Sequence, residues 1–95
     1  MKKDNRYTWS FSDGAYKKFR KLDIVAQKQI VKWLESHIEN SDNVRQWGKK
    51  LEGNLQTFWR YRVGKYRILA EIKDKEFMVL IVKADKRNDV YKNKR

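Results

Sequence analysis

Three arginines, Arg60, Arg62 and Arg67, lie within one short stretch of aromatic and β-branched residues, FWRYRVGKYRIL. That composition is typical of two β-strands, and the Gly-Lys pair between them is compatible with a two-residue hairpin turn. In that register Arg62 lies directly opposite Arg67. Like charges opposed across a strand pair are destabilising, on the scale of the roughly 0.2–1 kcal/mol that favourable pairs contribute. The arginines therefore indicate a site for a phosphate-like anion, which guanidinium groups bind in bidentate fashion.

Period-two alternation sorts the side chains of this predicted sheet into two faces. The face that helices are expected to cover carries Tyr61, Ile68, Ala70 and Ile72, joined by Phe77, Val79 and Ile81 if Asp74-Lys75 is also a two-residue turn. The three arginines point to the other face, beside Leu69, Leu80 and Val82. The alternative is that the arginines only extend into water and that one of them pairs with Glu71 or Glu76.

Further candidates for chemistry follow the last strand-like run, in ADKRNDVYK: Lys86, Arg87 and Tyr91. Because that strand would run antiparallel to the one carrying Arg67, its end is expected near the Arg62–Arg67 end of the same face. A tyrosine titrates at about 10, and surrounding cations would favour its phenolate. A Lys-Arg pair at a strand end is otherwise an ordinary solvated end.

The elements that would position these residues predict an α+β domain. A β-prone segment spans 6–11, and Ser12 or Asp13 can cap a helix to Leu22. After a second cap at Asp23, a stripe of mostly apolar positions steps by three and four to about Glu39, as in an amphipathic helix. These positions are Ile24, Gln27, Val31, Leu34 and Ile38, and Ile30 and Trp33 widen the stripe. We expect an N-terminal strand, a two-helix hairpin and a three-stranded antiparallel meander, with the helices packed on one face of the sheet.

The connector VRQWGKKLEGN between the helices and the meander is expected to hold one helical turn before a loop at Gly53-Asn54. Ninety-five residues make one domain, 1–95, in which 92–95 are expected to form a loose tail. The chain carries 24 Lys and Arg against 12 Asp and Glu, a net charge of +12. Such an excess indicates a polyanionic partner, nucleic acid first and an acidic protein second, although lysine-rich surfaces also serve solubility.

The composition excludes several classes of chemistry. Cysteine is absent and His37 is the single histidine, so disulfides, thiol catalysis and cysteine-based metal sites are impossible. We expect no metal and no cofactor, and we expect His37, four residues after Trp33, to lie at the surface or at the core edge. No apolar run approaches the ~20 residues of a membrane span, which predicts a soluble cytoplasmic protein without a membrane partner.

The chain resembles the RelE/ParE superfamily of toxins from bacterial type II toxin–antitoxin modules, and its RelE branch in particular. The resemblance covers nearly the whole chain and depends on KKFRKLD at Lys17–Asp23, GKKLEGN at Gly48–Asn54, WRYRVGKYRILAEI at Trp59–Ile72 and KRNDVY at Lys86–Tyr91. It implies an mRNA interferase, an endoribonuclease that cleaves mRNA in the ribosomal A site and so inhibits translation. The implied partners are mRNA, rRNA and a cognate antitoxin that wraps the toxin, with operator DNA bound only through the antitoxin complex.

The resemblance also implies a set of site residues. Carried over by position, the catalytic residues are Arg62, Arg67, Lys86, Arg87 and Tyr91, and the RNA-binding residues are Arg60, Lys49, Lys50 and Lys65. Many relatives have His where this chain has Lys86, and some have Lys at Arg60 or Arg62. Because arginine is effectively never deprotonated, proton transfer must fall to Lys86, Tyr91 or the ribosome.

RNA cleavage without a metal can use the ribose 2′-hydroxyl as the nucleophile on its own 3′ phosphate. Arg62 and Arg67 would then hold the phosphate, and Arg87 would stabilise the charge or the leaving group. Two other functions stay open. ParE-like relatives poison DNA gyrase without nuclease chemistry on the same fold. A plain RNA- or DNA-binding module is disfavoured, because such a sheet normally exposes aromatic residues and this one is expected to offer leucine and valine.

Overall fold

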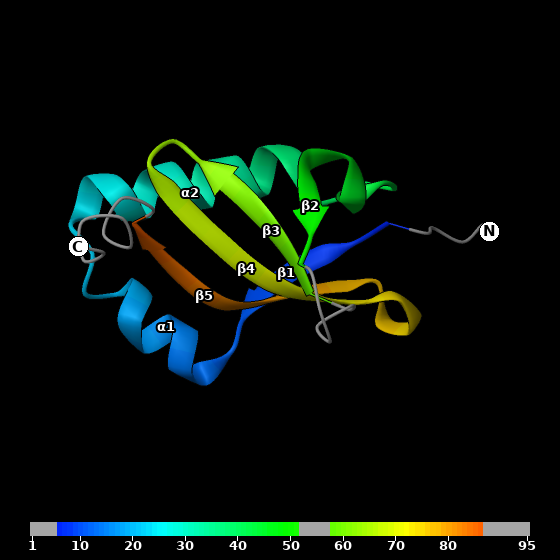
Figure 1. Cartoon of the computed structure of the whole chain (residues 1–95), viewed down its shortest axis with the longest axis horizontal. Coiled ribbons are helices and arrows are strands. Elements are labelled where there is room, and N and C mark those ends of the chain that lie inside the picture. Colours follow the sequence, from blue (N-terminus) through cyan, green and yellow to red (C-terminus); the bar gives the residue numbers. More distant parts are fainter. Residues whose placement is uncertain (1–5, 52–57, 87–95) are drawn as a thin grey trace.

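Two helices pack against one face of a five-stranded mixed sheet in the computed structural model, which describes residues 6–51 and 58–86 (Figure 1). In chain order the elements are β1 (Thr8–Phe11), α1 (Asp13–Phe19), α2 (Ile24–His37), the 3₁₀ helix η1 (Val44–Trp47), β2 (Gly48–Lys50), β3 (Phe58–Val63), β4 (Tyr66–Lys73), the 3₁₀ helix η2 (Asp74–Glu76) and β5 (Met78–Lys86). The predicted α+β class is confirmed. None of the described helices is long and apolar enough to cross a membrane.

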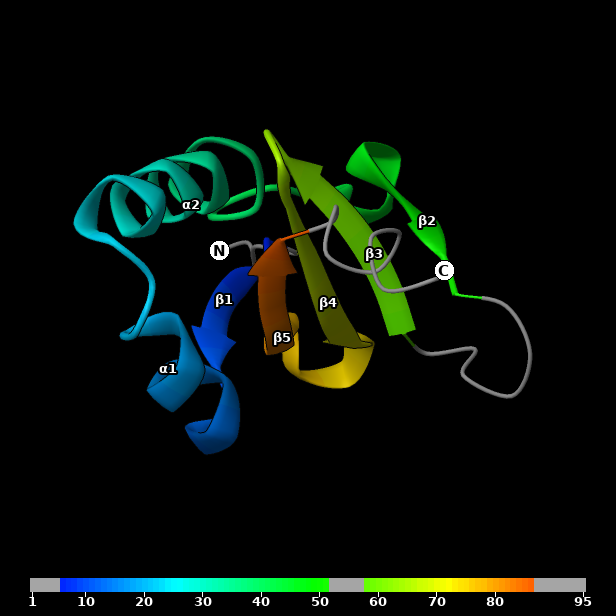
Figure 2. The ribbon, with the colours of Figure 1, turned by 60° about the vertical axis from the view of Figure 1, so that its left-hand side comes forward.

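The strands lie in the order β1-β5-β4-β3-β2, with α1 beside β1 (Figure 2), and α2 passes behind the turn end of the β3–β4 hairpin in Figure 1. The ring of Phe19 in α1 lies 4.6 Å from that of Phe11 in β1, and the ring of Trp33 in α2 lies 5.4 Å from that of Tyr61 in β3. Both helices therefore cover the same face, which we call the inner face, and the opposite one is the outer face.

Both helices begin at the predicted caps. The Ser12 side chain accepts from the Ala15 amide at 3.2 Å, and the Asp23 carboxylate accepts from the Ala26 amide at 2.7 Å. The first helix ends at Phe19, earlier than expected, because the chain tightens into a turn whose carbonyls accept from the side chain of Gln27. The second ends at His37, within two residues of the prediction.

The core lies between the helices and the inner face. Its residues include Tyr61, Ile68, Ala70, Ile72, Val79 and Ile81 from the sheet, as predicted, with Ala26, Ile30 and Leu34 from α2 and Ile38 directly after it. Ile24, expected on the buried stripe, is 60% exposed. At about 100° per residue it lies roughly 80° around the helix from Leu34, at the margin of the stripe.

Register in the β3–β4 hairpin follows the prediction: Val63 pairs with Tyr66 and Arg62 with Arg67. Gly64 takes the first turn position with φ +61°, a conformation that side-chain-bearing residues rarely adopt. The second turn is longer than the predicted two residues. It runs through η2 to Phe77, which has φ 51°, and Lys73 pairs with Met78.

Those two additional residues preserve the strand alternation, so Val79 and Ile81 still face the helices as predicted, whereas Phe77 falls in the turn. The ring of Phe77 meets that of Tyr7 edge-on at 5.4 Å. Tyr7 precedes β1, which pairs in parallel with β5 from Thr8 opposite Met78 to Phe11 opposite Ile81. The turn is therefore packed against the N-terminal strand, a long-range contact that local turn rules do not predict.

The connector after α2 contains the expected helical turn as η1, but it continues into a strand that was not predicted. β2 is three residues long, forms one edge of the sheet and pairs with β3, with Gly48 opposite Tyr61 and Lys49 opposite Arg60. A Cβ added to Gly48 would lie 2.2 Å from the Arg60 carbonyl oxygen. A short strand with two lysines carries no hydrophobic signal, and charged short edges also resist pairing with other chains.

A β-bulge interrupts the pairing of β4 with β5. Ala70 pairs with Ile81, but Leu69 pairs with Lys83, so Val82 is the additional residue. Beyond the bulge the alternation of β5 is reversed, and Ala84 becomes the buried residue while Asp85 pairs with Arg67. The bulge thus places Lys83 and Asp85 on the outer face beside the arginines, which a regular strand would not do.

Candidate nucleic-acid interface

Cationic side chains gather on the outer face in two cross-strand rows nearest the β3–β4 turn. The first row contains Arg62, Arg67 and Asp85, and the second contains Lys49, Arg60, Leu69 and Lys83. In these rows, five cationic side chains meet a single carboxylate. Arg62 is exposed, and Arg60 and Arg67 are half-buried. The prediction that the three arginines share the face opposite to the helices is confirmed.

Asp85 is the acidic neighbour of Arg67. Its Oδ1 lies 3.9 Å from Arg67 Nε, and its Oδ2 lies 3.8 Å from Lys83 Nζ. Both distances are too long for hydrogen bonds, and Asp85 Oδ1 is buried without a hydrogen-bond partner among the described residues. Within the described residues, neither Glu71 nor Glu76, the alternative partners, pairs with an arginine. Glu71 instead approaches Lys73 at 4.0 Å. Arg67 is therefore oriented loosely and keeps donors for an incoming anion.

Two hollows flank Arg60. The larger, about 230 Å³, is lined by Gln46, Trp47, Gly48, Lys49, Arg60 and Arg62. The smaller, about 130 Å³, is lined by Leu51, Arg60, Arg67, Leu69, Lys83 and Asp85. Arg62 and Arg67 are opposed in register but line different hollows. The apolar floor is Leu69 with Leu51, whereas Leu80 lies one row further away and Val82 occupies the bulge.

The remaining predicted site residues are dispersed. Lys49 lies opposite Arg60 on the outer face, whereas Lys50 lies opposite Trp59, whose other neighbour is the buried Ala70. Lys65 is exposed in the β3–β4 turn. Of the three predicted RNA-binding lysines, Lys49 alone is placed on the outer face of the sheet.

Lys86 pairs with the buried Tyr66, which places it on the inner side by alternation and not beside Arg67 as expected. The β-bulge is the cause, because it reverses the alternation of the last residues of β5. Arg87 and Tyr91 lie outside the described residues, so their roles stay predictions.

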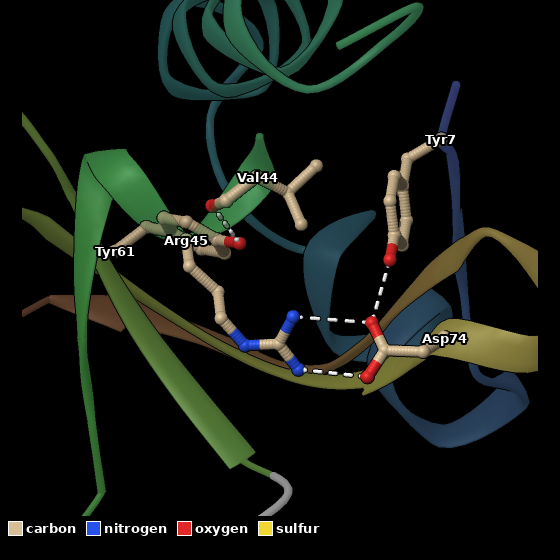
Figure 3. Close-up of polar contacts among 5 residues, drawn as sticks. All are labelled: Tyr7, Val44, Arg45, Tyr61 and Asp74. Carbon is tan, nitrogen blue, oxygen red and sulfur yellow. Dashed lines mark hydrogen bonds and ion pairs between the residues drawn. The ribbon is translucent and has the colours of Figure 1, made fainter. Parts of the chain in front are cut away.

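A second polar cluster, which the sequence analysis missed, joins segments that are far apart in the chain (Figure 3). Arg45 in η1 donates two hydrogen bonds to the carboxylate of Asp74, at 3.1 and 3.0 Å, and the Tyr7 hydroxyl donates to it at 2.6 Å. These bonds, those from Arg45 first, hold the pKa of Asp74 below its usual value. Desolvation, followed by the hydrogen bond to Asp74, raises the pKa of Tyr7.

This cluster fixes η1, which forms one wall of the larger hollow. The buried Tyr61 hydroxyl donates to the Val44 carbonyl at 2.8 Å, and burial raises the pKa of Tyr61. The Arg45 guanidinium also lies 5.5 Å from the centre of the Trp59 ring. Neither Tyr7 nor Tyr61 is therefore suited to accept a proton near neutral pH, and both serve to position the wall.

His37 lies at the core edge, as expected. Its ring stacks on Trp33 with centroids 4.5 Å apart, and its Nδ1 lies 2.9 Å from the Trp33 carbonyl oxygen. The ring of Trp47 meets it at 4.7 Å, nearly perpendicular. Across residues 6–51 and 58–86, no group of three or more His, Asp or Glu side chains is placed to hold a metal ion.

The fold is similar to that of small RelE toxins with solved structures. The toxin–antitoxin complex RelBE2 from Mycobacterium tuberculosis matches with a TM-score of 0.70 and 28% identity, over 86% of this chain and 99% of the matched chain. The isolated RelE toxin from E. coli matches with a TM-score of 0.69 and 24% identity, over 90% and 92%. The YoeB-YefM complex from Staphylococcus aureus matches with a TM-score of 0.62 and 22% identity, over 86% and 98%.

A family model described as the ParE toxin of the type II toxin–antitoxin system, parDE, matches residues 10–91. The chain belongs to this family, and the predicted membership of the RelE/ParE superfamily is confirmed. No curated protein sequence matches the chain significantly.

Proposed function

We propose that the protein is the ribonuclease component of a type II toxin–antitoxin module, an mRNA endoribonuclease that acts on the ribosome. One observation carries the proposal: Arg60, Arg62 and Arg67 occupy adjacent rows of the outer face, and Arg60 and Arg67 line one hollow together with the apolar side chain of Leu69. Guanidinium groups bind phosphate oxygens in bidentate fashion, and an apolar floor strengthens such contacts by excluding water. A protein that only needed solubility would have no reason to oppose Arg62 and Arg67.

The reaction that suits these residues is attack by a ribose 2′-oxygen on its own 3′ phosphorus. The new bond joins the 2′-oxygen to phosphorus, and the bond from phosphorus to the 5′-oxygen of the next nucleotide breaks, leaving a 2′,3′-cyclic phosphate and a 5′-hydroxyl. Arg62 and Arg67 would neutralise the phosphoryl oxygens, which carry the most charge in the transition state. A base takes the 2′ proton, and an acid protonates the departing 5′-oxygen.

Proton transfer is assigned to Tyr91, assisted by the cationic Arg87, or to a group of the ribosome. The pairing of Lys86 with Tyr66 on the inner side weighs against a direct role for Lys86. Because an unperturbed tyrosine titrates at about 10, the isolated protein would cleave RNA slowly. Ribosomal RNA would bind the basic surface and orient the mRNA for attack, which supports dependence on the ribosome.

A cognate antitoxin is the second proposed partner. The similar structure from M. tuberculosis is a toxin–antitoxin complex, and the net charge of +12 on this chain suits an acidic protein that neutralises the outer face. Operator DNA would be bound only through that complex.

The family model favours one alternative, because its description names the ParE toxin of parDE. A ParE-like protein would inhibit DNA gyrase without cutting RNA. Purified protein should be added to translating ribosomes, with primer extension to map cuts, and in parallel to a gyrase supercoiling assay. We expect cuts that recur with the codon period and active gyrase. Intact mRNA together with inhibited gyrase would replace the nuclease proposal by the alternative.

A further inference from the structure

Trp47 is the exposed one among the four tryptophans of the chain, all of which lie in the described residues. It is 42% exposed, at the end of η1, and it lines the larger hollow together with Arg60 and Arg62. A large aromatic ring beside two guanidinium groups is the arrangement with which proteins bind single-stranded nucleic acid, the ring stacking a base and the cations holding the backbone.

The position of this ring is fixed by a series of aromatic contacts that starts in the core. Ring centroids are 5.4 Å apart between Tyr61 and Trp33, 4.5 Å between Trp33 and His37, and 4.7 Å between His37 and Trp47. Tyr61 is fully buried, so the series runs from the centre of the protein to the rim of the hollow. An exposed tryptophan held in this way loses little conformational entropy when a base stacks on it.

We propose that Trp47 forms a nucleobase subsite, in which one base of a single-stranded RNA stacks on the indole while its neighbouring phosphate contacts Arg60 and Arg62. The inference rests on the proposed ribonuclease function and adds to it the group that sets the RNA in register. A hollow of about 230 Å³ falls below the roughly 300–1,000 Å³ of pockets that enclose drug-sized ligands, so it accepts a single base.

The polar part of the hollow suits the edge of a base. The side-chain amide of Gln46 donates to the Asn43 carbonyl at 3.1 Å through Nε2. No hydrogen bond to its Oε1 is found within residues 6–51 and 58–86, so this oxygen can accept from an exocyclic amino group, a common way for Gln to contact bases. Stacking supplies affinity for every base, whereas Gln46 favours bases that carry an amino group.

The test uses the full chain and a short single-stranded RNA whose 2′-hydroxyls are methylated, so that it cannot be cleaved. Fluorescence anisotropy at fixed salt compares the wild type with Trp47→Leu and Trp47→Phe. We expect about tenfold weaker binding for the leucine variant, because base stacking on an aromatic ring is lost, and near-wild-type binding for phenylalanine. Tyr16→Leu, which removes an exposed aromatic ring from α1, should leave the affinity unchanged.

Two further measurements separate stacking from a structural role. An RNA of the same length with abasic residues should bind the wild type and Trp47→Leu equally, and the slope of affinity against salt should be the same for both proteins, because no charge is changed. A 5-bromouracil RNA irradiated with the wild type should crosslink at Trp47. The subsite would be overturned if Trp47→Leu bound base-bearing RNA as tightly as the wild type does, or if the variant lost as much affinity for abasic RNA as for base-bearing RNA. Crosslinks confined to peptides other than the one that contains Trp47 would also overturn it.

The subsite and the ribonuclease activity fail in different ways. If ribosomal mRNA is cut at the same sites and rates by Trp47→Leu and the wild type, the subsite is wrong and the ribonuclease stands. If RNA binding depends on Trp47 but no mRNA is cut, the ribonuclease proposal is wrong and the subsite stands.

Discussion

Asp85→Asn is the substitution that most directly tests the electrostatics of the outer face. The carboxylate is the single acidic group in the two rows of five cations, and it lies 3.9 Å from Arg67 and 3.8 Å from Lys83. Its charge makes the electrostatic potential of the two rows less positive, so an RNA phosphate is attracted less strongly. The amide keeps the shape of the side chain and removes the charge, so RNA should bind the variant more tightly.

The magnitude follows from Coulomb's law. A phosphate held by Arg67 would lie roughly 7 Å from the carboxylate, and at an effective dielectric between about 20 and 80 the repulsion is roughly 0.6–2.4 kcal/mol. Both groups of the ion pair are about one-third exposed or more, and salt screens such charges. We therefore expect a gain near 1 kcal/mol, or about fivefold in affinity, at low salt.

The assay is anisotropy with the 2′-O-methylated RNA at low and at physiological salt. Asp13→Asn is the matched control, because it changes the net charge equally but lies in the first turn of α1, on the inner side of the sheet. We expect a larger gain for Asp85→Asn than for Asp13→Asn and a smaller difference between them at higher salt. Unchanged or weaker binding by Asp85→Asn would refute the idea that phosphate binds at this end of the face.

Three other predictions test separate parts of the structure. Arg67→Ala should reduce ribosomal mRNA cleavage by roughly 10²–10³-fold, the loss typical of one charge-stabilising donor, with an unchanged circular dichroism spectrum; full cleavage would remove Arg67 from the mechanism. The pKa of Asp74 is lowered in the folded state, so its contribution to stability is present above the unfolded value near 3.8 and is lost as pH falls through the folded value. The free energy of unfolding in urea should therefore depend less on acid pH for Asp74→Asn than for the wild type. Identical pH profiles of the two proteins would contradict this. Gly48→Ala should lower the free energy of unfolding by about 1–3 kcal/mol, because the added Cβ would meet the backbone of β3. The control Gly14→Ala in α1, where a Cβ would have no atom within 4 Å, should be neutral or stabilising by up to about 1 kcal/mol. Equal effects of the two substitutions in urea unfolding would show that β2 does not pack as described.

The parts of the fold that the sequence predicted are those governed by local patterns. Helix caps at Ser12 and Asp23 depend on side chains within three residues of the helix start, and the β3–β4 register depends on Gly64 and on alternation. These interactions involve neighbouring residues, so periodicity and turn chemistry are sufficient to identify them.

The parts that were not predicted depend on contacts between distant segments. β2 contains Gly48, Lys49 and Lys50 and becomes a strand because β3 offers it an edge, with a glycine that permits close approach. The β4–β5 turn is longer than expected because Asp74 is bonded to Tyr7 and to Arg45, from the N-terminal segment and from η1. No short-range pattern in the chain identifies either partner.

At the candidate site, strict alternation predicted the wrong faces for the last residues of β5, because it did not include the β-bulge at Val82. The bulge brings Lys83 and Asp85 to the outer face and turns Lys86 away from it. A bulge leaves no composition signal in a run such as MVLIVKADK, where apolar residues on both faces hide the period. The face on which the arginines lie was predicted correctly, because β3 and β4 are regular up to their shared turn.

The bulge also explains how the chain tolerates Arg62 opposite Arg67. Asp85 flanks Arg67 on its other side and partly neutralises the like-charge pair. Because it makes no hydrogen bond to Arg67, the donors of the guanidinium stay available to an anion. The two carboxylates that contact arginine in the described part of the chain differ in this respect. Asp74 accepts two bonds from Arg45 and one from Tyr7, which closes that cluster, whereas Asp85 holds Arg67 at 3.9 Å with one oxygen unpartnered.

This difference suits two separate tasks. A bidentate pair with a further hydrogen bond resists exchange, and Arg45 and Asp74 hold the η1 wall in a single position. A long ion pair between partly exposed groups is weak, so a phosphate dianion or diester can replace Asp85 at Arg67 with little loss. When an anion binds between the two rows, Arg67 would therefore exchange Asp85 for the anion. Trp47 and Arg60 would keep the positions that the η1 wall sets.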